Sequence, residues 1–277
     1  MFFFVKKIKK RIKEIYVNAT EFPLQPVQKK VLPKRQLPER AIPSVVYQTW
    51  RSIFFGKTHA QGIAHFRELN PDMEFNLFDD KDVDDYMEES YGKHPIYQIY
   101  KKAKFGPMKA DIFRYCILYE KGGYYFDIKG YIAKPISEIC PANCRGLISF
   151  ESNDCSIRPD GKALFKVQHT TKLVLQWGIG FAKGHRVLER MIDSICENYS
   201  FYKDRVFENP KPTILSYTGP GKFTKIVRGE IGRNETSDIY QAGVDFEGYG
   251  MYLMRGAEVR FLTSPSYTNF KNAKIVD

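Results

Sequence analysis

The segment from Lys109 to Lys129 constrains the fold of this chain more than any other stretch. It starts with a helix-compatible apolar run, pauses at Gly122-Gly123, and continues into residues 124–128, Y-Y-F-D-I, which have strand propensity. Glycine is the usual residue where a chain leaves a helix through a positive φ. A helix followed at once by a short apolar strand predicts an α/β unit whose strand ends on the carboxylate of Asp127.

The polar residues of this segment are spaced so that they meet. Asp111 and Arg114 are three positions apart, so a helix stacks them on one face. Strand alternation puts Tyr125, Asp127 and Lys129 on one side of the strand. A buried carboxylate without a partner is strongly disfavoured, and open α/β sheets bind ligands beyond the carboxyl ends of their strands. The segment therefore predicts a ligand site.

The pattern K-A-D-x-x-R-Y-x-x-L-Y-x-x-G-G-x-Y-x-D, from Lys109 to Asp127, resembles the sugar-binding DXD region of glycosyltransferase family 32. Three weaker matches follow the family's order, at residues 42–50, at residues 70–80 and at Thr218-Gly219-Pro220. Together the matches extend over about residues 42–225. The family includes yeast mannosyltransferases and bacterial capsule and lipopolysaccharide enzymes.

The resemblance implies a GT-A-like, Rossmann-like α/β fold, the nucleotide-diphospho-sugar transferase fold, in one catalytic domain over residues 44–277. It implies a hexosyltransferase that uses a UDP- or GDP-hexose donor and a glycan or lipid-linked acceptor, with retention of configuration, in surface polysaccharide synthesis. Alternating strand and helix patterns separately favour an α/β domain with a largely parallel sheet. The alternative is a catalytically degenerate relative that binds a glycan or a partner enzyme.

Roles for individual residues follow from the same resemblance. It implies that Asp111 and Arg114 bond the hydroxyls of the donor sugar, whereas an ordinary i, i+3 helix ion pair is the alternative. It implies that Asp127 holds the ribose, the sugar or a metal ion, and that Trp50 either stacks on the base or packs under a loop. The residues that it places around the substrate are Gln48, Trp50, Lys109, Tyr125, Lys129, Gln176, Trp177, Thr218 and Gly219.

One position departs from the family pattern. Asp127-Ile128-Lys129 stands where the family has D-x-D, whose second carboxylate usually holds a divalent cation beneath the diphosphate. Lys129 disfavours Mn²⁺ or Mg²⁺, which need oxygen ligands, and leaves Asp127 as the metal-ligand candidate. A lysine can itself neutralise a phosphate. The substitution therefore predicts either an enzyme that depends less on metal or an inactive one. Binding of a metal ion between Asp127 and the diphosphate of a bound donor is a further alternative.

Positive charge is concentrated at the start of the chain. The first 40 residues hold eleven Lys and Arg against three Glu, so +8 of the +11 net charge lies there. A nucleic-acid-binding domain would spread basic residues over a folded face, so we expect no nucleic-acid partner. Residues 1–21 predict a basic amphipathic arm whose residues 1–16 lie on an anionic membrane surface; packing on its own domain, or disorder, is the alternative. The Pro-rich residues 22–43 predict an extended linker.

The cellular compartment is predicted from the arm and the cysteines. The arm is too short and too charged to span a bilayer, and it lacks the apolar core and cleavage site of a signal peptide. The cysteines lack paired C-x-x-C spacing, so we expect free thiols in a reducing cytosol. We therefore expect a cytoplasmic protein, peripheral on the inner face of the membrane. The cysteines are Cys116, Cys140, Cys144, Cys155 and Cys196.

Overall fold

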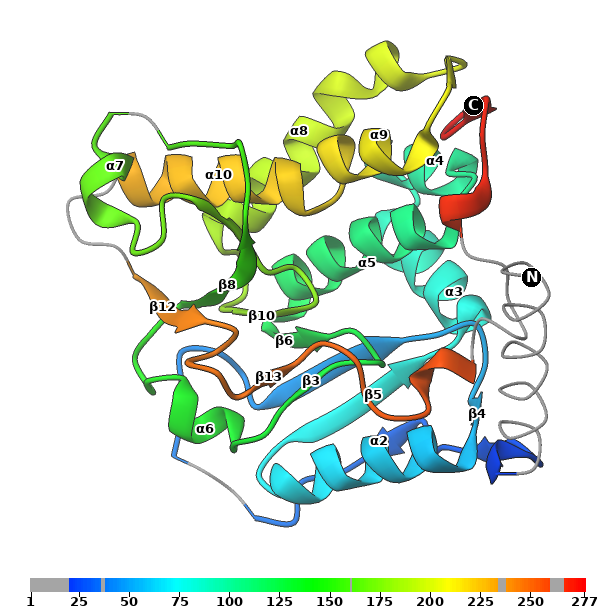
Figure 1. Cartoon of the computed structure of the whole chain (residues 1–277), viewed down its shortest axis with the longest axis vertical. Coiled ribbons are helices and arrows are strands. Elements are labelled where there is room, and N and C mark those ends of the chain that lie inside the picture. The colour runs from blue at the N-terminus through cyan, green and yellow to red at the C-terminus, as the bar shows by residue number, and fades with distance from the viewer. Residues whose placement is uncertain (1–19, 36–37, 160, 234–237, 260–266) are drawn as a thin grey trace, which may run out of the picture.

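The structure, a computed structural model, describes residues 20–35, 38–159, 161–233, 238–259 and 267–277. A central sheet carries helices on both faces (Figure 1). The strands of the sheet are β2 (Lys30–Val31), β3 (Val45–Thr49), β5 (Glu74–Phe78), β6 (Gly123–Phe126), β8 (Gly146–Asp154), β9 (Lys172–Val174), β10 (Gly178–Phe181) and β12 (Ile239–Val244). Their order is β12-β8-β10-β6-β3-β5-β2, with β9 beside β8. This architecture confirms the predicted α/β class.

The sheet is mixed, so the expectation of a largely parallel sheet was wrong. β3 pairs in parallel with β5 and β6, and β12 pairs in parallel with β8. β10 runs antiparallel to both β6 and β8, and β2 and β9 are also antiparallel to their neighbours. Parallel neighbours need a long crossover connection, usually a helix. Among the described residues between β8 and β10, the regular elements are the four-residue helix α7 (Ala163–Lys166) and β9, and β10 runs antiparallel to β8.

Two helical layers enclose the sheet. Most of the helices lie on one face, and α2 and α6 lie on the opposite face (Figure 1). On β3, Tyr47 packs with the larger helical layer, whereas its neighbour Val46 packs with Phe66 on the other face, as strand alternation requires. The larger layer contains α3 (Asp80–Tyr91), α4 (Pro95–Lys102), α5 (Gly106–Lys121), α8 (Arg186–Tyr202), α9 (Pro210–Tyr217) and α10 (Pro220–Arg233), and the smaller contains α2 (Lys57–Leu69) and α6 (Ile136–Ile139).

The helix–glycine–strand unit forms as its sequence predicts. α5 ends at Lys121, and Gly122 follows with φ of +69°. Gly123 also has a positive φ, and a Cβ there would lie 2.7 Å from the carbonyl oxygen of Val45 on β3. Any larger residue would push β6 away from β3. The two glycines therefore set the close approach that brings the end of β6 into the sheet.

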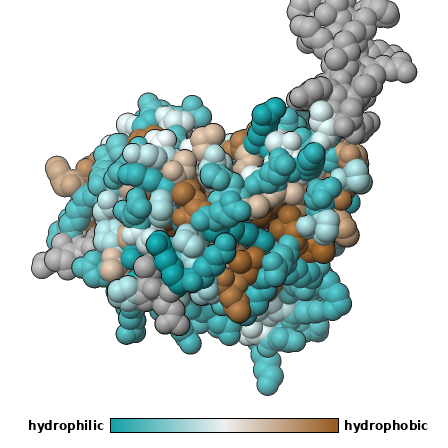
Figure 2. All heavy atoms as spheres, turned by 90° about the horizontal axis from the view of Figure 1, so that it is seen from below, coloured by the Kyte–Doolittle hydropathy of each residue, from teal (hydrophilic) through white to brown (hydrophobic). Residues whose placement is uncertain are grey.

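The Pro-rich segment lies against the catalytic domain. Its strand β1 (Gln25–Pro26) pairs with β4 (Phe54–Phe55), β2 pairs with β5, and Ile42 is buried. The predicted membrane-binding residues 1–16 lie outside the described residues. Within the described part of the chain, no helix combines the length and the apolar character needed to cross a bilayer. Figure 2 views the molecule from the α2 side, where hydrophobic patches are set in a largely hydrophilic surface.

Candidate active site

The site lies where three parallel strands end. β3, β5 and β6 run in the same direction, so their carboxyl ends share one edge of the sheet, and Asp127 directly follows β6. Because β10 is antiparallel to β6, the residues before β10 reach the same edge. The backbone N–H of Asp127 donates to the carbonyl oxygen of Trp177 at 2.7 Å. Such an edge is where open α/β sheets bind ligands.

Arg114 is the centre of the polar cluster. Its Nη2 lies 3.3 Å from Oδ1 of Asp111 and 3.3 Å from Oδ1 of Asp127. Its Nη1 donates to the carbonyl oxygen of Gln176 at 2.7 Å, and its Nε donates to that of Ala110 at 3.2 Å. Every nitrogen of the guanidinium thus has a protein partner. Arg114 therefore holds the two carboxylates in place.

A second set of hydrogen bonds ties α5 to the turn before α10. Oγ1 of Thr218 donates to Oδ2 of Asp111 at 3.0 Å. The carbonyl oxygen of Thr218 accepts from the Tyr115 hydroxyl at 2.8 Å and from Nε2 of Gln176 at 3.1 Å. Nε2 of Gln176 also donates to the Tyr115 hydroxyl. Thr218 and Gln176, both predicted as site residues, therefore act on the position of Asp111.

Burial separates the two carboxylates. The Asp111 side chain is 9% exposed. Its burial raises its pKa to about 7, and the nearby Asp127 adds a smaller increase. Arg114 and the hydrogen bond from Thr218 act in the opposite direction and lower the pKa. The Asp127 side chain is 23% exposed. Asp127 is therefore the carboxylate that is open to a ligand, and Asp111 supports it from behind.

Lys129 lies beside the open carboxylate. Its Nζ is 3.6 Å from Oδ2 of Asp127, donates to the Tyr252 hydroxyl at 2.7 Å, and lies 4.0 Å from the centre of the Tyr252 ring. The cations Arg114 and Lys129 thus balance the carboxylates Asp111 and Asp127.

That donor set does not fit a divalent cation in the free protein. The open carboxylate of Asp127 has a guanidinium and an ammonium as neighbours, where Mn²⁺ or Mg²⁺ requires several oxygen ligands. In the ranges that the structure describes, no group of three or more His, Cys, Asp or Glu side chains is placed to hold a metal ion.

Two further predicted residues lie within the site. The ring of Tyr125 packs 4.4 Å from the Arg114 guanidinium, where a cation–π contact stabilises the arginine. Trp177 is buried between Phe126 and Phe246 and therefore forms part of the floor beneath Lys129.

Four other residues predicted to contact the substrate make different contacts in the structure. Nζ of Lys109 lies 3.3 Å from Oδ1 of Asp84 on α3, away from the Arg114 cluster. Trp50 is half-buried and packs against the core on the α2 side. Gln48 is fully buried, and neither atom of its amide has a hydrogen-bond partner. Gly219 donates its N–H to the carbonyl oxygen of Ile214, within the turn that positions Thr218.

Tyr252 is a site residue that the sequence interpretation missed. Asp245, Phe246 and Glu247 all have positive φ, between 46° and 59°, which is uncommon away from glycine. This turn buries Phe246 against Trp177, and the following strand β13 (Gly250–Met251) pairs with β7 (Tyr131–Ile132) just beyond Lys129. The aromatic content of residues 246–252 was the available signal, but nothing local links it to Lys129.

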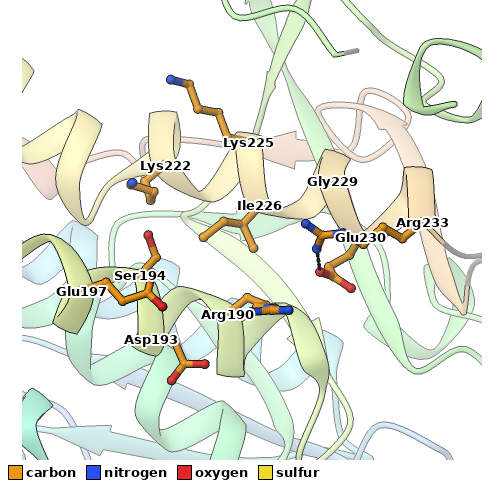
Figure 3. A pocket seen from close by; sticks show the side chains of 10 residues that line it. All are labelled: Arg190, Asp193, Ser194, Glu197, Lys222, Lys225, Ile226, Gly229, Glu230 and Arg233. Atoms are coloured by element: carbon orange, nitrogen blue, oxygen red, sulfur yellow. Dashed lines mark hydrogen bonds and ion pairs between the residues drawn. The ribbon is translucent and has the colours of Figure 1, made fainter. Parts of the chain in front are cut away.

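A groove of about 280 Å³ lies elsewhere, between α8 and α10 (Figure 3). Its walls carry four cations and three carboxylates, and Arg233 pairs with Glu230. None of the predicted site residues lines it; the lining residues are Arg190, Asp193, Ser194, Glu197, Lys222, Lys225, Ile226, Gly229, Glu230 and Arg233. Charged groups of both signs in an open groove are typical of a solvated surface, so we place the chemistry at the Arg114 cluster.

Comparisons with known proteins agree with this placement. Residues 56–145 match the family model described as a glycosyltransferase sugar-binding region containing the DXD motif. The chain is 28% identical over 209 residues to the initiation-specific alpha-1,6-mannosyltransferase of Candida albicans, covering 68% of this chain and 53% of that protein. It is 26% identical over 198 residues to the Schizosaccharomyces pombe protein of the same name, which covers 67% of this chain and 48% of that protein. It is 24% identical over 184 residues to inositol phosphoceramide mannosyltransferase 3 of S. pombe, which covers 65% of this chain and 43% of that protein.

The solved structure of PaToxG glycosyltransferase is similar in fold, with a TM-score of 0.50 and 17% identity over 81% of this chain and 77% of that chain. The chain therefore combines a fold similar to that of a solved glycosyltransferase with a match to the sugar-binding region model. Over these matches the chain is similar to the glycosyltransferase family whose sugar-binding region contains the DXD motif, family 32. It spans about half the length of the yeast alpha-1,6-mannosyltransferases that it matches.

Proposed function

We propose that this chain is a hexosyltransferase that moves a sugar from a nucleotide-diphosphate donor to a glycan or glycolipid acceptor. The observation that carries the proposal is the Asp111–Arg114–Asp127 cluster at the carboxyl end of β6, within the segment that matches the sugar-binding model. The yeast relatives are mannosyltransferases, which favours mannose as the donor sugar. Their names favour a mannose-bearing glycan or an inositol phosphoceramide headgroup as the acceptor.

The geometry gives each charged residue a role in transfer. The carboxylate of Asp127, with Asp111 behind it, accepts hydrogen bonds from hydroxyls of the donor sugar and fixes its orientation. Arg114 keeps both carboxylates aligned. The ammonium of Lys129, next to Asp127, offsets the negative charge that grows on the diphosphate as it leaves the sugar. The product keeps the donor's configuration, as the family resemblance implies.

The wider setting is also proposed. Residues 1–16 hold the protein on an anionic membrane surface, on the cytoplasmic side, where the acceptor is a lipid-linked or surface glycan. The basic composition of this segment supports the proposal.

A thermal-shift panel of GDP- and UDP-hexoses, with and without Mn²⁺, tests donor binding. A ligand at 100 times its Kd stabilises the folded state by about 2.7 kcal/mol, so the matching donor is expected to raise Tm by a few degrees. Asp127→Asn removes the open carboxylate and is expected to lose the shift. Asp85→Asn is the matched control, because Asp85 is an exposed residue of α3. The absence of a shift with every donor would overturn the proposal.

The presence of Lys129 in place of the second aspartate of the D-x-D motif favours one alternative function. In this alternative the protein binds the sugar donor but does not transfer the sugar. The two functions differ in a product assay with the donor identified by the panel and oligomannose or inositol phosphoceramide as acceptor. Transfer of labelled sugar supports the enzyme, and donor binding without product supports the degenerate relative.

A further inference from the structure

Two cysteines meet in the loop that follows α6. The sulfurs of Cys140 and Cys144 lie 2.9 Å apart, and both residues are buried, with exposures of 2% and 9%. Pro141, Ala142 and Asn143, between them, are exposed, so the pair lies just beneath the surface. The sulfurs of a disulfide are ~2.05 Å apart, so an approach of about 1 Å within this short loop would form the bond.

The surroundings favour a reactive sulfur at Cys140. The Tyr124 hydroxyl is buried next to this thiol, and the Arg40 guanidinium donates to the Cys140 carbonyl oxygen. The hydrogen bond from Cys144, together with Tyr124 and Arg40, lowers the pKa of the Cys140 thiol to about 7 despite its burial. The thiolate is the nucleophilic form in disulfide exchange.

We propose that Cys140 and Cys144 form an oxidative modification site, which closes to a reversible intrachain disulfide on exchange with a small disulfide such as oxidised glutathione. The Cys140 thiolate attacks one glutathione sulfur, giving a mixed disulfide and releasing one glutathione thiolate. The Cys144 thiol loses its proton to solvent and attacks the Cys140 sulfur, releasing the second thiolate. Two protein thiols are oxidised and one glutathione disulfide is reduced to two glutathione molecules.

The bond would form where the N-terminal segment joins the catalytic domain. The carbonyl oxygen of Ala142 accepts the backbone N–H of Ala41 at 3.0 Å, and the Cys140 carbonyl oxygen accepts from Arg40. The oxidation state of the pair therefore sets the rigidity of the loop that anchors residues 40–42. This proposal stands apart from the transferase activity, because none of these residues touches the Arg114 cluster.

Peptide mapping of the full chain tests the proposal. The protein is equilibrated with mixtures of reduced and oxidised glutathione, blocked with N-ethylmaleimide under denaturing conditions, and cleaved with trypsin. Both cysteines fall in the peptide of residues 130–145, since the bond between Lys134 and Pro135 resists trypsin. In the oxidising mixtures this peptide is expected to lack maleimide and to be lighter by two hydrogen atoms. Dithiothreitol is expected to restore two maleimide-reactive thiols.

Three results would overturn the proposal. They are two maleimides on the peptide at every glutathione ratio, a glutathione adduct that never resolves, and a bond from this peptide to Cys116, Cys155 or Cys196. Cys144→Ser removes the second thiol, so its peptide is expected to retain glutathione on Cys140. Cys155→Ser is the matched control and is expected to reproduce the wild-type pattern, because the Cys155 sulfur donates to the Ile157 carbonyl oxygen in a different loop. The wild-type result decides the question if either variant folds poorly.

Discussion

At the scale of residues, the cations Arg114 and Lys129 balance the carboxylates Asp111 and Asp127, and the Asp127 carboxylate is the one exposed to solvent. Arg114 has protein partners on all its nitrogens, so it contributes by holding Asp111 and Asp127 at fixed positions. Asp111 is costly to ionise where it lies, which is why its pKa rises to about 7. Thr218 and Arg114 offset part of that cost. Changes to any of these residues should therefore affect the orientation of Asp127.

The first prediction concerns Asp111 and Arg114. Asp111→Asn removes the charge that Arg114 bridges, and Arg114→Lys keeps a charge but loses the planar fork that reaches both carboxylates. We expect each change to lower kcat/KM for sugar transfer by more than about tenfold, which corresponds to ~1.4 kcal/mol of transition-state stabilisation. Steady-state kinetics with the donor identified in the thermal-shift panel provides the measurement.

Arg190→Lys is the control for the arginine change, because Arg190 lies in the charged groove between α8 and α10. It is expected to leave the kinetics unchanged. Circular dichroism and Tm show whether the site variants remain folded. Wild-type kinetics in folded Asp111→Asn and Arg114→Lys would return this pair to an ordinary helix ion pair.

Lys129 provides the second prediction, which concerns metal dependence. Its ammonium occupies the place of the family's second carboxylate and lies 3.6 Å from Asp127. We expect transfer by the wild-type protein to survive EDTA, because Lys129 supplies the positive charge next to the diphosphate. Lys129→Asp replaces that cation with a carboxylate and is expected to make transfer dependent on Mn²⁺. Assays of both proteins in EDTA and in added Mn²⁺ measure this difference.

Lys134→Asp is a matched control for the second prediction, because the Lys134 ammonium lies over the ring of Tyr249, outside the cluster. It should stay insensitive to EDTA. If EDTA abolishes transfer by the wild-type protein and Mn²⁺ restores it, Lys129 does not replace the ion.

At the scale of elements, the sequence predicted what local chemistry determines. The helix before Gly122-Gly123 and the strand after it form as expected, because capping and strand propensity are properties of short segments. Local chemistry also accounts for the start of α3, where Asp79 forms a capping box with Asp82.

Elements that depend on distant pairing were predicted less well. Residues 173–182 are a largely hydrophobic run, but the structure divides it into β9 and β10, which are separated by residues 175–177. The break lets the backbone of Gln176 and Trp177 turn toward Arg114 and Asp127. A hydrophobic run does not show which strand it will pair with, so the break and the antiparallel direction of β10 were not visible.

Side-chain partners from remote segments were the hardest to predict. Lys109 is close to Asp111 in sequence, but the helix turns it toward Asp84. Tyr252 lies 123 positions from Lys129, yet its hydroxyl oxygen accepts a hydrogen bond from the lysine ammonium, which also lies over its ring. Composition and spacing carry no information on such contacts. The family resemblance found the strand of the site, and the structure was needed to find its neighbours.

At the scale of the whole molecule, the N-terminal segment is part of the catalytic domain from residue 25 onwards. β1 and β2 pair with β4 and β5, so residues 25–26 and 30–31 are held against the domain. The arm that precedes these strands would therefore hold the domain at a restricted distance from any surface that it binds. The concentration of positive charge in the first 40 residues supports the proposal that this surface is anionic.

The last prediction concerns this arm. Residues 1–16 are expected to insert their apolar side chains among lipids while the lysines neutralise anionic headgroups. The full chain should sediment with vesicles containing phosphatidylserine, and less of it should sediment as salt rises, because the Debye length falls from ~10 Å at 0.1 M to ~3 Å at 1 M. A chain beginning at Thr20 keeps β1 and β2 and should remain in the supernatant. Vesicles of phosphatidylcholine alone are the control for charge, and equal recovery of the two chains on the anionic vesicles would show that the arm does not bind the membrane.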